Sequence, residues 1–214
     1  MNSKTLVVGS LAFDIIFSIP GDFRKSIPLV NGEIRNFNAT YVANEKKEHP
    51  GGTAGNIAFW LGGQGEKCDI FSVWGKDIEQ KGYRQKLEKL GAKFVGGEGE
   101  HTAHAYMVSD QLHQQLIIWQ PNAYEEIDEC SLLDYYSEND LRDFEFAIFS
   151  AGTPLSIQKH LKEFRSLNKK AVVIFDPGQV SQFFTKENFN ECSGLSDILV
   201  GNNIEFRYFS DYGF

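Results

Sequence analysis

The stretch 49–65, HPGGTAGNIAFWLGGQG, combines glycines, a threonine and an asparagine with an apolar run of helical spacing. Gly51 and Gly52 lie where this helix is predicted to begin. Backbone N–H groups at a helix start carry partial positive charge, and glycines let a ligand approach them. Asn56, on the first turn, adds an amide that both donates and accepts. The pattern suits a polyhydroxylated ligand such as a sugar, and a turn needed only for close helix–strand packing is an equally favoured alternative.

Asp14 interrupts the apolar stretch AFDIIFSI. A carboxylate is costly to bury without partners, so this side chain either faces solvent or holds a ligand. One carboxylate accepts two short hydrogen bonds, which matches two vicinal hydroxyls of a ribose. Considered alone, Asp14 is better explained as an ordinary exposed residue of a strand end.

The elements that must position these residues follow from the hydrophobic pattern. Short β-branched runs predict strands at 5–9, 13–19 and 68–75, and a helix is predicted over 77–92. The segment 101–121 is typical of a β-hairpin. From residue 144 onward strands and helices alternate, which indicates a parallel sheet with helices on both faces. Ligands of such sheets bind at the carboxyl ends of the strands, where Asp14, Gly75–Asp77, Asp176 and Asn202 are expected.

Composition and charge narrow the classes of partner. The chain of 214 residues has a formal net charge of −8 and no block rich in Lys and Arg, so nucleic acid is not expected as a partner. The sequence contains no run of about 18 apolar residues, so no membrane-spanning segment is predicted. The three cysteines are far apart and indicate neither a disulfide framework nor a metal site, which favours the cytoplasm.

Several short motifs occur in a recognisable order: LVVGSLAFDIIFSIPG, GGTAGNIAF, VWGKD, HTAHAYMVSD, FDPGQ and GNNIEF. In this order and at these separations they resemble the ribokinase-like (PfkB) family of carbohydrate and nucleoside kinases, with wording closest to bacterial adenosine kinases. The resemblance implies an α/β fold: a mostly parallel central sheet flanked by helices, with a small β lid. Residues 1–20 and 51–214 would form the core and residues 21–50 the main part of the lid.

The resemblance also implies substrate-binding roles. Asp14 would hold ribose hydroxyls, Gly51, Gly52 and Asn56 would complete the sugar pocket, and Asn36 or Asn38 would approach the substrate from the lid. Trp119 would stack on a purine base, although a place in the core of the hairpin is equally favoured. Gln179 is a further polar contact.

Asn202 and Glu205 match the N-x-x-E motif of the family, which organises Mg²⁺ and phosphates through water. Mg²⁺ keeps several waters, so few direct protein ligands are needed, and no direct metal ligand is assigned. The same spacing is a capping box at a helix start, and both roles are compatible.

The implied activity is transfer of the ATP γ-phosphate to the 5′-hydroxymethyl group of a nucleoside, with adenosine giving AMP. A sugar kinase of the ribokinase or fructokinase type and a non-catalytic nucleoside- or sugar-binding fragment are the alternatives. The family's Gly-x-Gly-Asp motif supplies the general base and an anion hole, and it does not occur in this sequence. We therefore expect the C-terminal part of the fold to be missing and this chain to be inactive alone. A homodimer through the lid is a further hypothesis.

Overall fold

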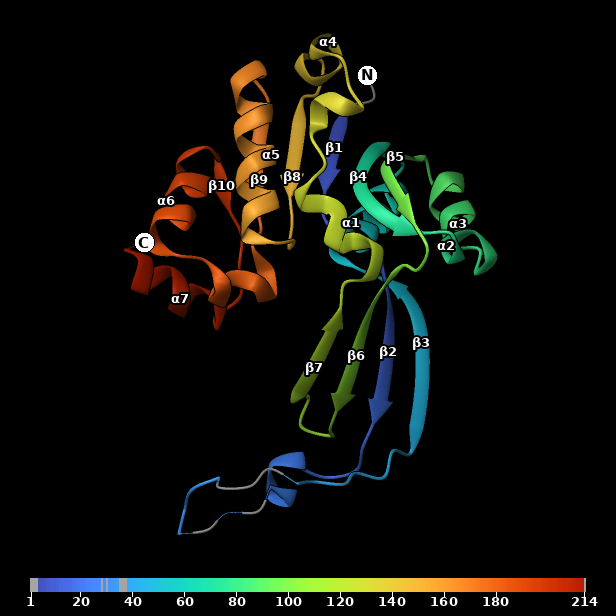
Figure 1. Ribbon diagram of the computed structural model, residues 1–214, viewed down its shortest axis with the longest axis vertical. Coiled ribbons are helices and arrows are strands. Elements are labelled where there is room, and N and C mark those ends of the chain that lie inside the picture. The colour runs from blue at the N-terminus through green and yellow to red at the C-terminus, as the bar shows by residue number, and fades with distance from the viewer. Residues whose placement is uncertain (1–3, 28, 30, 35–37, 214) are drawn as a thin grey trace.

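Two β-sheets organise the chain (Figure 1). The computed structural model describes residues 4–27, 29, 31–34 and 38–213. Among these residues, one sheet has six strands in the order β10-β9-β8-β1-β4-β5, and the other has four in the order β3-β2-β6-β7. The second sheet projects from the edge of the first where β1 ends (Figure 1).

Every neighbouring pair of strands in the six-stranded sheet runs parallel. Its strands are short and mostly buried, as expected for a sheet covered on both faces. They are β1 (Thr5–Val8), β4 (Cys68–Gly75), β5 (Ala92–Gly99), β8 (Phe146–Phe149), β9 (Val172–Phe175) and β10 (Ile198–Leu199). The strands that the sequence predicts at 5–9 and 68–75 are confirmed.

Alternating residues of β1 point into two separate cores. Leu6 and Val8 belong to a cluster that includes Leu161 of α5. Val7 lies in a second cluster with Ala58 of α1 and Leu87 of α3. Because successive side chains of a strand face opposite sides of the sheet, helices cover both faces, which confirms the predicted α/β architecture.

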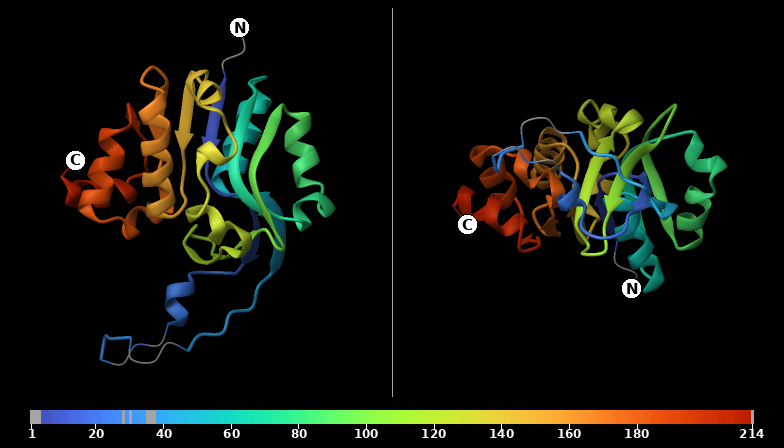
Figure 2. Two further views of the ribbon diagram at one scale, coloured as in Figure 1. Left: turned by 45° about the horizontal axis from the view of Figure 1, so that its top comes forward. Right: turned by 90° about the horizontal axis from the view of Figure 1, so that it is seen from below.

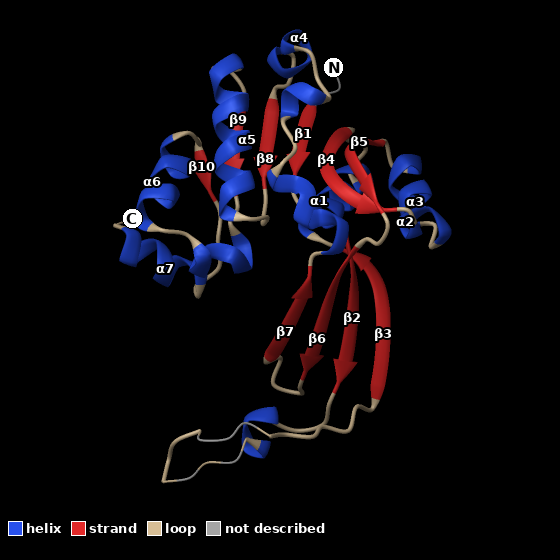
Figure 3. Ribbon diagram, viewed as in Figure 1, coloured by secondary structure: helices blue, strands red, loops and turns tan. Residues whose placement is uncertain are grey.

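Helices lie around this sheet (Figure 3). They are α1 (Thr53–Gly63), α2 (Asp77–Gln80), α3 (Tyr83–Lys89), α4 (Glu138–Arg142), α5 (Pro154–Leu167), α6 (Lys186–Gly194) and α7 (Glu205–Tyr212), with 3-10 turns η2 (Asn122–Asp128), η3 (Leu132–Asp134) and η4 (Gly178–Phe183). Ser137 and Asp140 form a capping box that opens α4.

The single helix predicted over 77–92 is wrong. The chain forms α2 and α3 instead, and Gly82 between them adopts a left-handed conformation with φ of 68°. A glycine populates this region without steric cost, so it ends one helix and redirects the next. Gly91, at φ of 94°, follows α3 and leads into β5.

The second sheet joins segments that are distant in sequence. β2 (Ala12–Ser18) pairs antiparallel with β3 (Glu45–Gly51) and parallel with β6 (Ala103–Ser109). β7 (Gln115–Gln120) pairs antiparallel with β6, which confirms the predicted hairpin. No helix covers most of this sheet in the part of the chain that the structure describes (Figure 3).

The composition of the second sheet differs from the division drawn from sequence. Only β3 comes from residues 21–50, whereas β2 and the hairpin come from segments assigned to the core. The described residues of 21–44 include the 3-10 turn η1 (Phe23–Ser26) and lie at the far end of the sheet (Figure 2). Pairing between distant segments leaves little local trace in a sequence, which explains the difference.

In the part of the chain that the structure describes, no helix is both long and apolar enough to cross a membrane.

Candidate functional site

The glycines at the start of α1 lie against Asp14. Gly51 is the last residue of β3 and pairs with Ala12 of β2. A methyl group placed on Gly51 would lie 2.1 Å from Oδ2 of Asp14, so the carboxylate occupies the space that a larger residue would fill. The backbone N–H of Gly52 lies close enough to the same carboxylate to lower its pKa. The structure therefore brings Asp14, Gly51 and Gly52 together.

The surroundings of Asp14 influence its ionisation in opposite directions. Burial is the largest influence and raises the pKa of Asp14, while the positive charge of His49 and the N–H of Gly52 lower it. His49 lies directly opposite Asp14 in the β2–β3 ladder. A half-buried carboxylate with few donors gains from a ligand that supplies hydroxyl groups, because each hydroxyl replaces a lost water.

The first backbone N–H groups of α1 are not free to bind a ligand, contrary to the prediction from the sequence. The N–H of Thr53 donates to Oγ of Ser10 at 3.2 Å, and the N–H of Ala54 donates to the carbonyl oxygen of Ser10 at 3.0 Å. These groups are therefore engaged within the chain and not open to a ligand. A buried helix start must satisfy its first amides, and Ser10, two residues after β1, is placed to do so.

Ser10 is one of the residues that sequence reasoning missed. Its partner Thr53 accepts a hydrogen bond from Oγ of Ser150 at 2.9 Å and donates to the carbonyl oxygen of Ala151 at 3.1 Å. This network links the ends of β1 and β8 to α1. Ser10 lies two residues after β1 and Ser150 directly follows β8. Small hydroxyl residues at the ends of two buried strands are the sequence pattern that could have indicated this network.

Trp119 shares one row of the second sheet with Asp14. Asp14 pairs with Ala105 of β6, and Ala105 pairs with Trp119 of β7. Paired residues project from the same face of a sheet, and two strand spacings separate their backbones by roughly 9–10 Å. The indole is 43% exposed and stands edge-on to Tyr124, with ring centroids 6.3 Å apart. Ala105 between them is small, and it is itself buried, with 8% of its surface exposed.

Asn202 and Glu205 form a reciprocal cap at the start of α7. The backbone N–H of Asn202 donates to Oε2 of Glu205, and its side-chain amide donates to Oε1, both at 2.8 Å. In return, Oδ1 of Asn202 accepts from the N–H of Glu205 at 3.1 Å. The capping role that the sequence allows is therefore present.

A second carboxylate lies near this cap. Burial raises the pKa of Asp176, and the charge of Glu205 raises it further. Asp176 directly follows β9, and the motif of Asn202 follows β10, so both stand at the carboxyl ends of neighbouring strands. Two nearby carboxylates and an amide oxygen are the ligand types that Mg²⁺ prefers. No group of three or more acidic, histidine or cysteine side chains gathers closely enough to hold a metal ion in the described part of the chain, so a cation here would be held largely through its waters.

The remaining predicted residues are not in contact with Asp14 among the described contacts. Asn56 is exposed and lines a hollow of about 240 Å³ together with Pro50, Trp60 and Tyr83. Asn38 and Gln179 are exposed on loops or turns. Asn36 lies outside the described residues.

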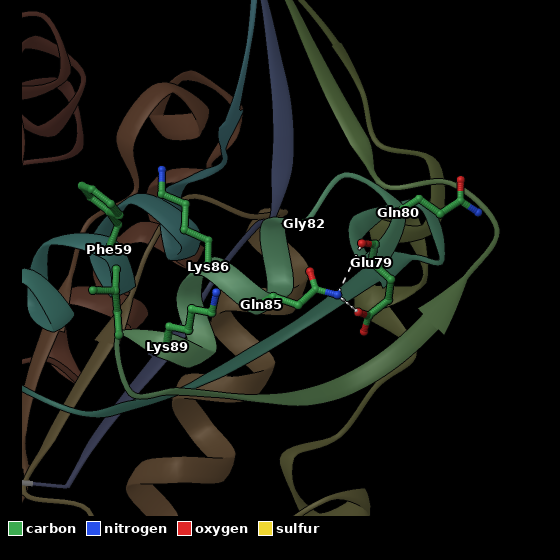
Figure 4. Close-up of a pocket in the computed structure, with 8 residues that line it drawn as sticks. Phe59, Glu79, Gln80, Gly82, Gln85, Lys86 and Lys89 are labelled. Carbon is green, nitrogen blue, oxygen red and sulfur yellow. Dashed lines mark hydrogen bonds between the residues drawn. The ribbon is translucent and has the colours of Figure 1, made fainter.

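A larger hollow, of about 590 Å³, lies between α1 and the pair α2 and α3 (Figure 4). Lys86 stands over the ring of Phe59 at 4.8 Å from its centroid, and Gln85 donates to Oε2 of Glu79 at 2.7 Å. None of the predicted site residues lines it. The row of Asp14 and Trp119, and not this hollow, is therefore the candidate site.

Two of the quoted motifs contact each other at the junction of the two sheets. Asp77 belongs to the motif VWGKD and Thr102 to the motif HTA. Oγ1 of Thr102 donates to Oδ1 of Asp77 at 2.6 Å, and the N–H of Thr102 donates to the same oxygen at 2.8 Å. Thr102 is fully buried. The pair holds the start of β6 beside the end of β4, which fixes the second sheet at the strand ends of the first.

The fold and the site together define an α/β protein with a carboxylate, a glycine turn and an aromatic ring beside the strand ends of a parallel sheet. Residues 30–211 match the pfkB family of carbohydrate kinases. The chain belongs to this family.

Similar proteins include kinases of nucleosides and of sugars. A nucleoside kinase of Methanothermobacter thermautotrophicus is 27% identical over 206 residues, which cover 94% of this chain and 60% of that protein. The structure of Burkholderia thailandensis nucleoside kinase in complex with inosine has a TM-score of 0.78 at 21% identity, covering 97% of this chain and 63% of that one. A Thermotoga maritima ribokinase has a TM-score of 0.70 at 23% identity, with coverage of 99% and 63%. The chain thus spans less than two thirds of the length of these relatives.

Proposed function

We propose that this chain carries the acceptor-binding part of a nucleoside kinase, in which Asp14 holds the ribose hydroxyls and Trp119 stacks on the base. The observation that carries the proposal is the shared row of Asp14, Ala105 and Trp119. A nucleoside has hydroxyls at one end and a flat aromatic base at the other. The spacing of two strands between the carboxylate and the indole suits both ends at once.

The second sheet serves as the lid over this acceptor in our proposal. It carries Asp14 and Trp119 on one face, where the indole also contacts Tyr124 of η2. The sheet projects beyond the central sheet (Figure 3). Its opposite face exposes Leu116 and Ile118 of β7. These apolar side chains support the hypothesis of a homodimer through the lid, because exposed apolar patches favour association.

ATP is the proposed phosphate donor, with Mg²⁺ beside Asp176 and the cap of Asn202 and Glu205. Family membership supports this assignment, and a ribokinase of Cryptococcus neoformans was solved in complex with ADP. Mg²⁺ would neutralise phosphate charge through its bound waters.

Adenosine is the preferred acceptor, and a sugar kinase of the ribokinase or fructokinase type is the second candidate. The sequences HTA (residues 101–103), WQP (residues 119–121) and DPGQ (residues 176–179) favour adenosine. The ribokinase likeness favours the second candidate. A nucleoside acceptor and a free-sugar acceptor differ in whether Trp119 contributes to binding affinity, because a free sugar has no base to stack on the indole.

Isothermal titration calorimetry with adenosine, inosine, D-ribose and D-fructose separates these candidates. We expect nucleosides to bind, and Asp14→Ala to abolish binding. Trp119→Ala should weaken nucleoside binding about 5- to 150-fold, the value of a stacked base. Trp60→Ala is the matched control, because Trp60 is 69% exposed on α1 and outside the row. Equal loss from both tryptophan variants, or binding that is indifferent to Asp14, would contradict the proposal.

A further inference from the structure

One peptide group at the candidate site is held at both of its ends. The carbonyl oxygen of Gly51 accepts a hydrogen bond from the hydroxyl of Tyr83 at 2.6 Å. The N–H of the same peptide group, which belongs to Gly52, lies close enough to the carboxylate of Asp14 to lower its pKa. Tyr83 is the first residue of α3 and only 3% exposed, so its hydroxyl reaches the turn from the interior.

The backbone alone does not fix the direction of this peptide group. Its two residues are both glycines, and Gly52 adopts φ of 79°. Glycine reaches many combinations of φ and ψ at similar energy, so a peptide between two glycines rotates more readily than any other. A partner on the carbonyl side therefore decides where the N–H on the other side points.

The position of the Tyr83 hydroxyl depends on a third glycine. A methyl group on Gly55 would lie 1.7 Å from the hydroxyl oxygen of Tyr83. The ring itself is held beside Phe13, with centroids 5.9 Å apart. Gly55 of α1 and Phe13 of β2 thus make room for the ring of Tyr83, whose hydroxyl joins α3 to the last residue of β3.

We propose that Tyr83 is a positioning residue: by holding the carbonyl of Gly51, it aims the N–H of Gly52 at Asp14 and keeps that carboxylate oriented toward the bound acceptor. Loss of the hydroxyl leaves a carbonyl without its donor in a buried place. The peptide then rotates to find another partner, and Asp14 loses its backbone donor. This inference rests on the proposed function for its effect on binding, but not for its effect on Asp14.

Few charged groups surround Asp14 among the described residues, so a change in its pKa can be assigned to a single altered neighbour. His49 faces it from β3. Burial raises the pKa of the Tyr83 phenol, and the nearby charge of Asp14 raises it further. Lys81, before α3, stands over the ring of Phe13 at 4.1 Å from its centroid and is paired with Glu48. The other side chains named here, those of His49, Lys81 and Glu48, are unchanged when the hydroxyl of Tyr83 is removed.

The test is Tyr83→Phe, compared with Tyr136→Phe. Tyr136 is a matched control, because it is 5% exposed and its hydroxyl donates to a different carboxylate, Asp69, at 3.2 Å. Carbon-detected NMR of the side-chain carboxyl gives the pKa of Asp14 in ligand-free protein. We expect Tyr83→Phe to raise this pKa above that of the unmodified chain and to speed hydrogen exchange at the Gly52 amide, while Tyr136→Phe changes neither.

Binding supplies the functional readout. Adenosine affinity should fall about tenfold in Tyr83→Phe, the effect of one lost hydrogen bond, with no change in Tyr136→Phe. An Asp14 pKa and a Gly52 exchange rate that match the control would overturn the role of Tyr83. If the unmodified chain binds no nucleoside or sugar, the proposed function fails, but the two measurements on ligand-free protein still decide the role of Tyr83.

Discussion

The α carbon of Gly51 lies so close to the carboxylate of Asp14 that a methyl group there would approach Oδ2 to 2.1 Å and Oδ1 to 2.5 Å. This contact explains one glycine of the motif by packing. Gly52 is explained similarly, because a methyl group on it would lie 2.5 Å from the carbonyl oxygen of Ser10. The glycines therefore do not expose the helix start to a ligand; they let Asp14 and the first turn of α1 share one small volume.

Gly51→Ala should displace Asp14 and abolish ligand binding while also lowering stability. The new methyl group would overlap a charged group held between β2 and β3, so one of them must move. Gly63→Ala is the control, since its methyl group would meet no atom within 4 Å at the last residue of α1. That change should stabilise the chain by about 0.4–1 kcal/mol. Urea unfolding with calorimetry checks both variants, and equal behaviour would show that Gly51 is not constrained by Asp14.

The sequence predicted most of the elements because local patterns determine them. The β-branched run TLVV predicts a buried strand, and Ser137 with Asp140 predicts the start of α4. The break at Gly82 was missed because a glycine within a helical pattern is compatible with both continuation and a left-handed turn. The partners of β2 were missed because they are set by pairing between residues far apart in sequence.

The candidate site was predicted residue by residue, but not as an arrangement. Asp14 and Trp119 are separated by more than a hundred residues, and only the register of β2, β6 and β7 places them in one row. Ser10 and Tyr83 were missed because serine and tyrosine near strands and helices are common. Their roles come from the single backbone groups that they bond, which a sequence does not reveal.

Asp14→Asn should increase the thermal stability of the chain near pH 7. Burial raises the pKa of Asp14 in the folded state, so the folded chain binds its proton more tightly than the unfolded chain. Stability from this group is therefore present below the unfolded pKa of about 3.9 and is lost as pH rises through the folded value. Asparagine removes the charge and can still accept from Gly52.

Melting curves at pH 4 and pH 7 measure this effect. The gain from Asp14→Asn should be larger at pH 7 than at pH 4, and ligand binding should be lost, as expected for a functional residue that costs stability. Asp143→Asn, at an exposed position, serves as the reference. A lower melting temperature for Asp14→Asn than for Asp143→Asn at pH 7 would refute the explanation by burial.

His160 of α5 should make the chain sensitive to mild acid. Its side chain is fully buried, its Nε2 lies 3.0 Å from the carbonyl oxygen of Cys130, and its Nδ1 has no partner among the described residues. The carbonyl must accept, so Nε2 carries the proton and Nδ1 is the site that an additional proton would occupy. That proton would be buried beside the ring of Phe71, whose centroid is 5.0 Å away.

The sign of this effect is opposite to that of Asp14. Burial lowers the pKa of His160, and the nearby Glu163 and Asp128 only partly oppose this. The unfolded chain therefore takes up a proton near pH 6.5 that the folded chain does not bind, so stability falls as pH drops below about 6.5.

His160→Gln keeps a donor for Cys130 but does not titrate, and its unfolding free energy should fall less between pH 7.5 and 5.5. His113→Asn, exposed and at φ of 59°, where asparagine is tolerated, should follow the unmodified chain. Urea unfolding at the two pH values measures these slopes, and a slope for His160→Gln equal to that of His113→Asn would exclude His160 as the source of the acid sensitivity.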